Sequence, residues 1–354
     1  MIIEFPVSRL TPSRPFFSIV VPTWNRGPMI EETLHSLLNQ DFPHSQYEII
    51  IVDDGSTDDT LERLQSFSSR IRVLRQPKSG TAAARNLGIR NANGDYIVSF
   101  DSDDILAPYA LSVYKIVIDA FDRPPVVLAQ HTSFHGHAVN LYPARPSMIS
   151  CIKCRDYFGK AVQSSTFNIN FVLRKDVVLG VGGYSFDSFD DTDLIFKLGT
   201  ASPMVKIVQP ITTAVRLHDG NVTKDLTFFT QGMKMHIQSE RRGVYPGGRK
   251  RMLDRRGLIG VKVLSSLYRY YIPARHVALT TRLAHIARLL LYARGMVPAA
   301  VVRKCCSYFY FQESRLLASD SGYDRGRGTA VTVAKERTDH EHGLGPQTDV
   351  GACR

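Results

Sequence analysis

Short apolar runs of strand-forming residues alternate with stretches of helical spacing through the first hundred residues of the chain. The runs that predict strands cover residues 17–21, 47–52, 71–74 and 96–100. The stretches that predict helices lie near residues 30–39, 56–67 and 80–94, and Ser56 and Asp59 have the spacing of a helix N-cap and its N3 residue. This alternation predicts an α/β fold with a mainly parallel, Rossmann-like sheet flanked by helices on both faces.

Unusual polar residues follow three of these predicted strands. Residues 23–26 follow the first strand, Asp53 and Asp54 end the second, and residues 101–104 follow the fourth. Ligands of open parallel sheets bind outside the carboxyl ends of the strands, so these residues are expected to converge on one crevice. Any one of these groups could simply form a turn, but three groups at the same edge of the sheet favour a binding site.

The acidic run Asp101-Ser102-Asp103-Asp104 directly follows the apolar run 96–100. Isolated buried charges are costly and normally have a positive partner. Carboxylate oxygens suit hard divalent cations, and Mg²⁺ is often held by one or two carboxylates together with substrate phosphates. The run therefore predicts an enzyme that handles a metal–diphosphate. The alternative is a solvated acidic turn that caps the next segment.

The following part of the chain gives weaker signals. A helix is expected from about Pro108 to Phe121, with strands at residues 126–128 and 171–174, whereas residues 131–165 have no clear pattern. A second acidic group at residues 190–193 precedes apolar residues whose spacing predicts a helix with the acids in its first turn. Helix dipoles favour acids at that place, so capping alone can explain this second group.

The formal charge of +11 is concentrated in one segment of the chain. Residues 241–316 carry 16 basic and 2 acidic residues, whereas residues 1–240 have a net charge of −2. The spacing of apolar residues and arginines over residues 278–293 predicts a basic amphipathic helix, which fits an anionic membrane surface. An equally good alternative is a helix that packs on the catalytic domain with solvated arginines. No nucleic acid is expected as a partner, because no known RNA- or DNA-binding pattern is present.

These features predict a catalytic domain at residues 15–240, a basic helical segment at 241–316 and a polar, disordered tail at 317–354. We expect a cytoplasmic protein that lies peripherally on the inner face of the membrane, because no signal peptide or membrane-spanning window is evident. The five cysteines indicate a reducing compartment. Cys151 and Cys154 form a CxxC pair, but a zinc site is disfavoured because a second well-spaced pair is missing.

Five motifs in order give the chain a resemblance to a known family. They are residues 18–26 (SIVVPTWNR), residues 51–58 (IVDDGSTD), Gly80 with Ala84-Arg85-Asn86 and Gly88, Asp101-Ser102-Asp103-Asp104, and Gly182-Gly183-Tyr184 followed by residues 190–194 (DDTDL). In this order the motifs resemble the family-2 glycosyltransferases of the GT-A fold. The resemblance covers residues 15–225 and implies inverting transfer of a sugar from a nucleotide-diphosphate donor, UDP favoured, to a glycan or lipid-linked acceptor with Mg²⁺ or Mn²⁺.

The resemblance also implies roles for particular residues. Asp54 or Asp53 would accept a hydrogen bond from the base, and Trp24 would lie against it. The expected nucleotide-sugar contacts are Pro22, Thr23, Trp24, Asn25, Asp53, Asp54, Arg85, Asp101 and Ser102. Asp103 would bind the metal with help from Asp101 and His218, and Asp191 would be the general base. The alternative for His218 is an ordinary surface or core histidine. Asp190 departs from the family pattern, because relatives commonly have Glu there, and this change keeps the charge but shortens the reach of the carboxylate.

Three alternatives compete with this interpretation. A nucleotidyltransferase that makes nucleotide sugars has a glycine-rich, basic loop after the first strand, where this chain has Pro22-Thr23-Trp24-Asn25. A dinucleotide-dependent dehydrogenase needs GxGxxG at the same place, and that motif is missing. A non-enzymatic membrane-binding protein would explain residues 241–316, but it would not explain three acidic or polar strand ends.

Overall fold

The computed structural model describes residues 14–138, 142, 146–158, 170–187, 190–218, 226–266, 279–293 and 330–334. By their packing, these residues form two compact units. The first contains the described residues up to Asp187, the segment Ala201–His218 and the strand Ala330–Ala334. The second contains the described residues between 188 and 200 and between 219 and 327. The domain boundaries at residues 240 and 316 stay a prediction.

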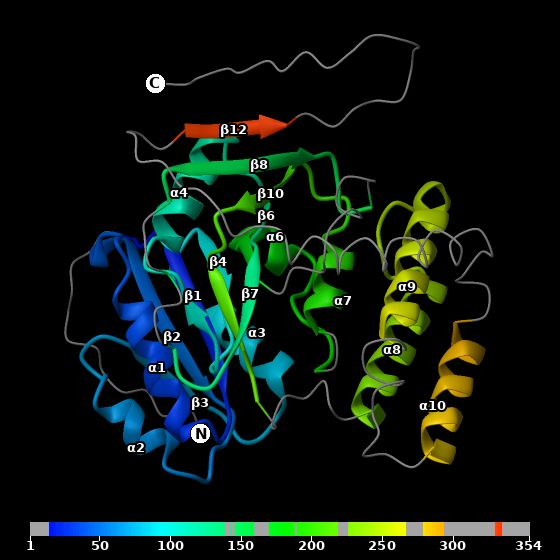
Figure 1. Ribbon diagram of the computed structural model, residues 1–354, viewed down its shortest axis with the longest axis horizontal. Helices are drawn as coiled ribbons and strands as arrows, with labels where there is room; N and C mark the ends of the chain where they lie inside the picture. Colours follow the sequence, from blue (N-terminus) through cyan, green and yellow to red (C-terminus); the bar gives the residue numbers. More distant parts are fainter. Residues whose placement is uncertain are drawn as a thin grey trace. The chain divides into compact units, whose positions relative to one another are not determined.

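The first unit is built on a nine-stranded sheet in the order β12-β8-β10-β6-β9-β4-β1-β2-β3 (Figure 1). The strands are β1 (Phe17–Thr23), β2 (Tyr47–Asp53), β3 (Arg72–Arg75), β4 (Tyr96–Ser99), β6 (Val126–Leu128), β8 (Met148–Cys154), β9 (Phe171–Arg174), β10 (Met204–Gln209) and β12 (Ala330–Ala334). β1 pairs in parallel with β2 and β4, and β2 with β3. β9 is antiparallel to both β4 and β6, and β8 is antiparallel to β10. The predicted α/β fold with a mainly parallel sheet is confirmed.

A smaller sheet has the order β5-β11-β7. Its strands are β5 (Ile105–Leu106), β7 (His131–His135) and β11 (Thr213–Leu217), and β11 runs parallel to β7 and antiparallel to β5. Because β5 follows the acidic run and β11 ends one residue before His218, this sheet brings two distant parts of the chain to the end of β4.

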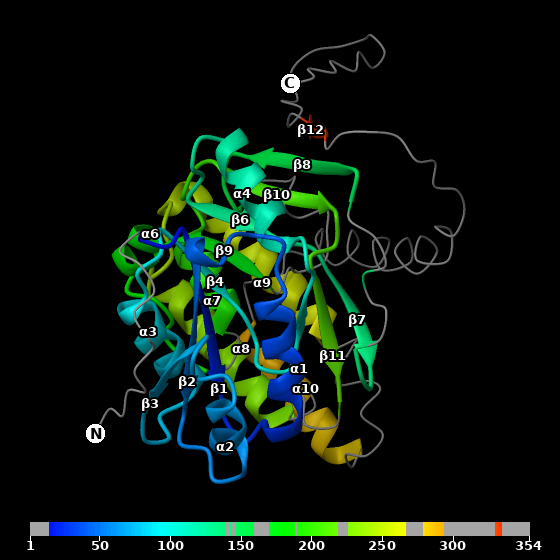
Figure 2. The ribbon, with the colours of Figure 1, turned by 90° about the vertical axis from the view of Figure 1, so that its left-hand side faces the viewer.

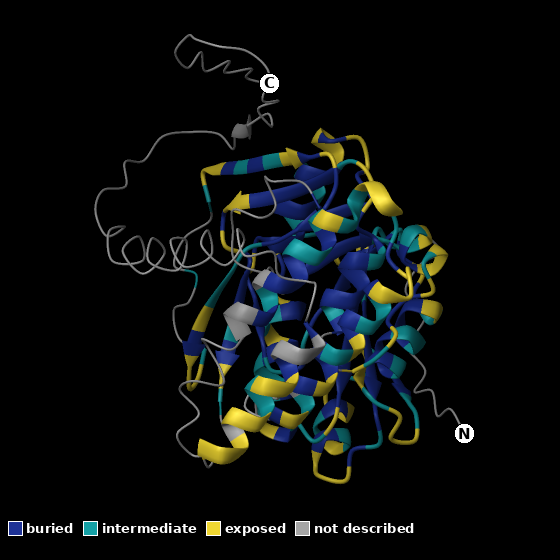
Figure 3. Cartoon of the chain, turned by 90° about the vertical axis from the view of Figure 1, so that its right-hand side faces the viewer, coloured by how far each residue is buried: buried dark blue, intermediate teal, exposed yellow. Residues whose placement is uncertain are grey.

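Helices cover both faces of the large sheet (Figure 2). They are α1 (Gly27–Leu38), α2 (Thr60–Gln65), α3 (Thr81–Asn91), α4 (Ala110–Ala120) and α6 (Lys175–Gly180). Leu34 of α1 and Tyr114 of α4 share one core with Ile19 of β1, and all three are fully buried. α3 packs on the other face, where a Cβ at Gly88 would lie 2.4 Å from Val20, so glycine lets this helix approach the sheet. Figure 3 shows the central strands of the sheet buried and the outer helix faces partly exposed.

Three local predictions differ from the structure. α2 begins at Thr60 rather than at Ser56, because the Ser56 hydroxyl accepts the N–H of Asn25 instead of capping a helix. The part of the chain expected to be irregular, residues 131–165, contains β7 and β8. Residues 317–354, expected to be disordered, lie outside the described residues except for Ala330–Ala334, whose β-branched residues form a strand parallel to β8.

The second unit is helical. It contains α7 (Asp190–Lys197), α8 (Leu226–Arg241), a 3₁₀ turn η3 (Arg249–Arg251), α9 (Met252–Ser266) and α10 (Leu279–Tyr292). The ring of Phe196 on α7 lies 4.5 Å from His236 on α8 and 5.2 Å from Tyr245. The helices expected around the second acidic group and over residues 278–293 are confirmed. Among the described helices, none is long and apolar enough to cross a membrane.

Candidate active site

The acidic run lies at the carboxyl end of β4, as the sequence predicts. Ligand atoms of Asp101, Asp103 and Asp104 all lie within 4.8 Å of one another. The hydroxyl of Thr33 on α1 donates to the backbone carbonyls of Ser102 and Asp104, at 3.1 and 2.9 Å, and holds the turn in place. Ser102 is buried, so its backbone supports the turn on which the three carboxylates converge.

Asp104 is the buried member of this group, and it is not among the metal ligands that the resemblance implies. Its Oδ1 accepts the N–H of Arg216 at 3.0 Å, and within the described part of the chain its buried Oδ2 has no hydrogen-bond partner. Burial raises the pKa of Asp104 well above its ordinary value, and the charges of Asp101 and Asp103 raise it further. Three hard oxygen donors, one buried and unpaired, are a set that fits Mg²⁺ or Mn²⁺.

Arginine and histidine side chains flank the two other carboxylates. Arg85 on α3 donates to Oδ1 of Asp101 at 2.5 Å, and its guanidinium carbon lies 5.1 Å from the centre of the Tyr184 ring. Nε2 of His218 lies 2.9 Å from Oδ2 of Asp103, and Nε of Arg26 lies 3.5 Å from the same oxygen. The structure therefore brings together Asp101, Asp103, Arg85 and His218, which the sequence proposed as one site.

Arg216 on β11 connects the acidic run to α1. Its Nε donates to the carbonyl of Asp103 at 2.9 Å, its Nη1 donates to the carbonyl of Gly136, and its Nη2 donates to Glu32 at 2.9 Å. Glu32 also pairs with His137. Burial raises the pKa of Glu32, but the hydrogen bonds from His137 and Arg216 outweigh it and lower the pKa to about 2. Arg216 is almost fully buried, so it fixes the turn that carries the carboxylates.

Asp54, at the end of β2, organises the loop between β3 and α3. Its Oδ1 accepts from the Gln76 side chain at 2.7 Å and from the N–H of Ser79 at 2.8 Å. Its Oδ2 accepts the N–H of Gly80 at 2.9 Å and lies 3.1 Å from Nζ of Lys78. Burial raises the pKa of Asp54, but these four partners outweigh it and hold the pKa below its ordinary value. A base N–H would have to replace one of them, since two carboxylate oxygens accept about four hydrogen bonds.

Asp53 and Asn25, which are also expected near the nucleobase, shape the loops around it. Asp53 is fully buried; it accepts the N–H of Ser56 and lies 3.2 Å from Nε of Arg75, so it shapes the loop after β2. Asn25 has a φ of +50° and its Oδ1 accepts the N–H of Thr57 at 2.9 Å, which joins the loops after β1 and β2.

Three consecutive residues at the end of β1 lie at the same edge of the sheet. Pro22 belongs to β1, and the carbonyl of Thr23 accepts the N–H of Asp54 at 2.9 Å. Trp24 is 46% exposed at this edge, where a ligand can reach it. The direct contacts of all these residues with a nucleotide stay predictions.

Two of the sequence motifs, those that contain Asn86 and Tyr184, are joined by a pair of hydrogen bonds. The Asn86 side chain donates to the carbonyl of Tyr184 at 2.8 Å and accepts its N–H at 2.9 Å. Gly183 has a φ of +67°, and a Cβ there would lie 2.2 Å from Oδ1 of Asn86, so a side chain at this position would break these hydrogen bonds. The motifs around Arg85 and Gly183 are thus parts of one contact.

Asp191, the expected general base, lies on α7 in the second unit. Its N–H donates to Oδ1 of Asp190 at 2.9 Å. Lys262 on α9 donates to the hydroxyl of Thr192; burial lowers the pKa of Lys262 to about 7, while the charges of Asp191 and Asp190 raise it. Asp193 is buried and accepts the hydroxyl of Tyr245 at 2.8 Å. α7 is therefore held by residues that follow position 240.

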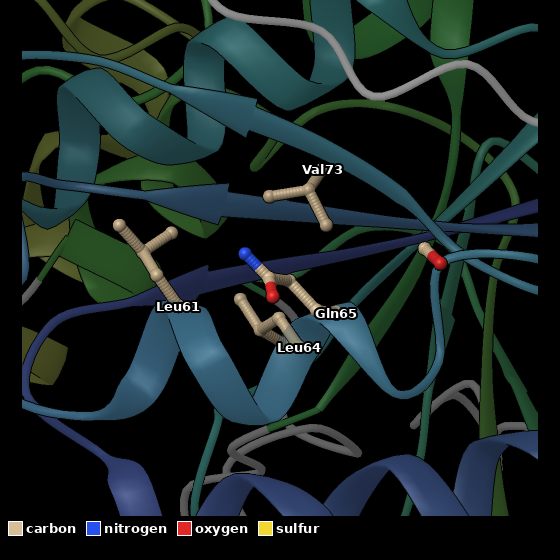
Figure 4. Close-up of a pocket in the computed structure, with 5 residues that line it drawn as sticks. Leu61, Leu64, Gln65 and Val73 are labelled. Carbon is tan, nitrogen blue, oxygen red and sulfur yellow. The ribbon is translucent and has the colours of Figure 1, made fainter.

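Two hollows in the first unit lie elsewhere. One of about 10 Å³ between α2 and β3 is lined by Leu61, Leu64, Gln65, Ser68 and Val73, and it holds at most a water molecule (Figure 4). The other, of about 470 Å³, lies at the amino ends of β1, β4 and β6 and is lined by Arg14, Asp95, Arg123, Arg174, Lys175, Asp176 and Leu179. Both are remote from the carboxyl ends of β1, β2 and β4, where the candidate site lies.

Comparisons with known proteins agree with this geometry. Residues 18–183 match the family described as Glycosyl transferase family 2. Poly(ribitol-phosphate) beta-N-acetylglucosaminyltransferase TarS of Staphylococcus aureus is 35% identical over 127 residues, which are 35% of this chain and 22% of TarS. Glycosyltransferase GlyG of Streptococcus pneumoniae is 45% identical over 129 residues, which are 35% of this chain and 42% of GlyG. The matches thus span less than half of each curated relative.

A solved structure extends the likeness to most of the chain. The crystal structure of S. aureus TarS 1-349 in complex with UDP-GlcNAc superposes with a TM-score of 0.61 and 19% identity, covering 80% of this chain and 82% of that one. This likeness confirms the GT-A fold that the motifs predicted.

Proposed function

Because residues 18–183 match the model of glycosyltransferase family 2, we propose that the protein transfers a sugar from a nucleotide-diphosphate donor to a hydroxyl group of a glycan or glycolipid acceptor. One observation carries this proposal: three carboxylates with hard oxygen ligands converge at the same sheet edge as Trp24 and Asp54. A nucleoside diphosphate needs both groups of residues. Its planar base can stack on Trp24, and its anionic phosphates can be bridged to the carboxylates by a cation.

The donor is best sought among UDP-sugars. The TarS structure holds UDP-GlcNAc, and TarS is named as a transferase that acts on poly(ribitol-phosphate). Another partial match, to 99 residues, is to a putative teichuronic acid biosynthesis glycosyltransferase of Bacillus subtilis, TuaG. These names favour a role in the synthesis of a polysaccharide or a related polymer.

Asp103, Asp101, Asp104 and His218 are the residues that would hold Mg²⁺ or Mn²⁺. A divalent cation bound there would act as a Lewis acid that neutralises the charge growing on the leaving diphosphate. Arg85 keeps Asp101 in place through its 2.5 Å contact, and Arg216 fixes the backbone of Asp103. Asp191 would take the proton of the acceptor hydroxyl, and attack from the face opposite the diphosphate would invert the anomeric carbon.

Thermal unfolding with a panel of nucleotide sugars and Mn²⁺ tests this function. A donor that binds only the folded protein raises Tm by mass action, and we expect UDP-sugars to give the largest shift. Asp103→Asn should abolish the Mn²⁺-dependent shift. Asp122→Asn is the matched control, because Asp122 is exposed in the same unit and its φ of +54° suits asparagine. A panel without any Mn²⁺-dependent shift would refute the proposal.

We also propose that the basic segment contacts an anionic membrane surface. Arg241, Arg242, Arg249 and Lys250 are exposed, and Leu253 beside them is 70% exposed. In contrast, Arg255 is buried against Glu240 at 2.6 Å, so it serves the fold of the second unit. Each exposed basic residue near an anionic surface contributes about 1 kcal/mol.

A liposome sedimentation experiment separates these groups of basic residues. Replacement of Arg241, Arg242, Arg249 and Lys250 by Gln should abolish binding to vesicles that contain anionic lipid. Replacement of four exposed basic residues of the first unit, Arg70, Arg90, Lys153 and Arg155, is the control and should leave binding intact. Equal binding by both variants would contradict the membrane proposal.

A further inference from the structure

Lys78 lies on the loop between β3 and α3, and its ammonium contacts two residues of the candidate base site. Its Nζ is 3.6 Å from the centre of the Trp24 ring and 3.1 Å from Oδ2 of Asp54. The side chain is about half exposed, so it covers the ring from the solvent side without being locked in the core. No sequence pattern connects Lys78 with either residue.

The backbone around Lys78 is fixed, so only the side chain is free to move. Asp54 accepts the N–H groups of Ser79 and Gly80, the two residues that follow Lys78. Gly55 has a φ of +78°, and a Cβ there would lie 2.9 Å from the backbone nitrogen of Lys78, so glycine permits this close approach of the two loops. Lys78 is thereby anchored next to Asp54, with a flexible stem that reaches over Trp24.

A nucleobase would need the same two contacts. A base stacked on an aromatic side chain lies about 3.5 Å above the ring, which is where the Lys78 ammonium lies. Two of the four partners of Asp54 are backbone N–H groups and a third is the partly buried Gln76 side chain, so the exposed Lys78 side chain is the partner that a base N–H can replace. The base and the ammonium cannot occupy this position together.

We propose that Lys78 occupies the nucleobase subsite of the free protein and is displaced when the donor nucleotide binds. This inference rests on the proposed function, because it takes Trp24 and Asp54 as the base subsite. Displacement breaks one cation–π contact and one ion pair between the half-exposed Lys78 and the buried Asp54, which lowers nucleotide affinity. Lys78 thus sets the donor concentration at which the site fills, and it does so through competition rather than contact with the sugar.

The single tryptophan of the chain makes the test direct, because intrinsic fluorescence then reports on Trp24 alone. Lys78→Met removes the charge but keeps an unbranched apolar side chain, Lys78→Arg keeps the charge, and Lys153→Met is the control at an exposed lysine of the same unit. In the absence of nucleotide, Lys78→Ala, which removes the side chain that contacts the ring, should increase quenching of Trp24 by neutral acrylamide. Unchanged quenching would overturn the inference at its structural premise.

Titration of the same proteins with UDP and Mn²⁺ tests displacement. Lys78→Met should bind UDP roughly tenfold more tightly than the wild type, whereas Lys78→Arg and Lys153→Met should bind like the wild type. Equal or weaker binding by Lys78→Met would overturn the inference and leave the proposed function intact, since Lys78 would then stay in place or contact the nucleotide. If no variant and no wild-type sample binds UDP or any other nucleotide, the proposed function fails and the inference fails with it.

Discussion

The Nε2 atom of His218 lies 2.9 Å from Oδ2 of Asp103, although the two residues are 115 positions apart in the chain. Removing a group that supports or completes a metal site typically costs 10- to 100-fold in metal affinity. We therefore expect His218→Ala to raise the Mn²⁺ concentration for half-maximal UDP binding by about tenfold or more. Calorimetric titration at several Mn²⁺ concentrations measures this, with His44→Ala in η1 (His44–Gln46) as the control. An unchanged Mn²⁺ dependence would remove His218 from the metal site.

Glu32 should make stability depend on acid pH. Its pKa is lowered to about 2 in the folded protein, so the ionised form stabilises the fold fully above its ordinary value of 4.5, and this contribution is lost as pH falls towards 2. We expect Glu32→Gln to cost about 1–3 kcal/mol at pH 7, after a discount for partial exposure, and less as pH falls below 4.5. Urea unfolding from pH 7 to 3.5 measures the difference. Glu31→Gln, whose partner Arg63 is at the surface, should show no such trend.

Asp191→Asn should separate binding from transfer. Loss of a general base lowers turnover by about 10²- to 10⁴-fold while donor binding persists. Asp190→Asn is the matched control and should keep most of the turnover, because asparagine keeps the side-chain oxygen that accepts the N–H of Asp191. Turnover with a purified acceptor and calorimetry with UDP measure the two properties. A fully active Asp191→Asn variant would exclude Asp191 as the base.

Lys262 should produce a rise of stability at alkaline pH. Burial lowers its pKa to about 7 from an ordinary value of 10.5, so between these values the unfolded chain binds a proton that the folded protein does not. Stability then rises with pH, by at most about 1.4 kcal/mol per pH unit from this group. Lys262→Met should flatten the rise, and Lys250→Met, at an exposed position, should not. Urea unfolding at pH 7, 8 and 9 measures how the free energy of unfolding changes with pH. Identical slopes for the wild type and Lys262→Met would contradict this prediction.

The sequence predicted the central strands and the edge at which the site lies because both leave local signals. The run from Tyr47 to Val52 is almost continuously apolar, as a strand buried on both faces must be, and its end is marked by Asp53 and Asp54. The acidic run after β4 was found in the same way. Asp103 and Asp101 could thus be placed at one edge before any distance was known.

Contacts between distant residues left no such signal. Arg216 and Glu32 are separated by 184 positions, and neither belongs to a pattern that marks a buried ion pair. Lys78 reads as an ordinary surface lysine, since its role depends on a loop that Asp54 and Gly55 bring beside Trp24. Asp104 could have been found from the spacing of three acids in four residues, but burial of its second oxygen became visible only in the fold.

The contacts of α7 limit where this protein can be cut or recombined. A truncation after residue 240 would remove Tyr245 from Asp193 and Arg255 from Glu240, leaving two buried carboxylates without those partners. Asp193 would keep Lys197 at 3.2 Å, but Glu240 would lose Arg256 as well as Arg255, and breaking a buried pair of this kind costs roughly 3–5 kcal/mol. Chimeras that exchange acceptor preference between relatives should therefore carry residues 190–200 together with 226–266 as one cassette.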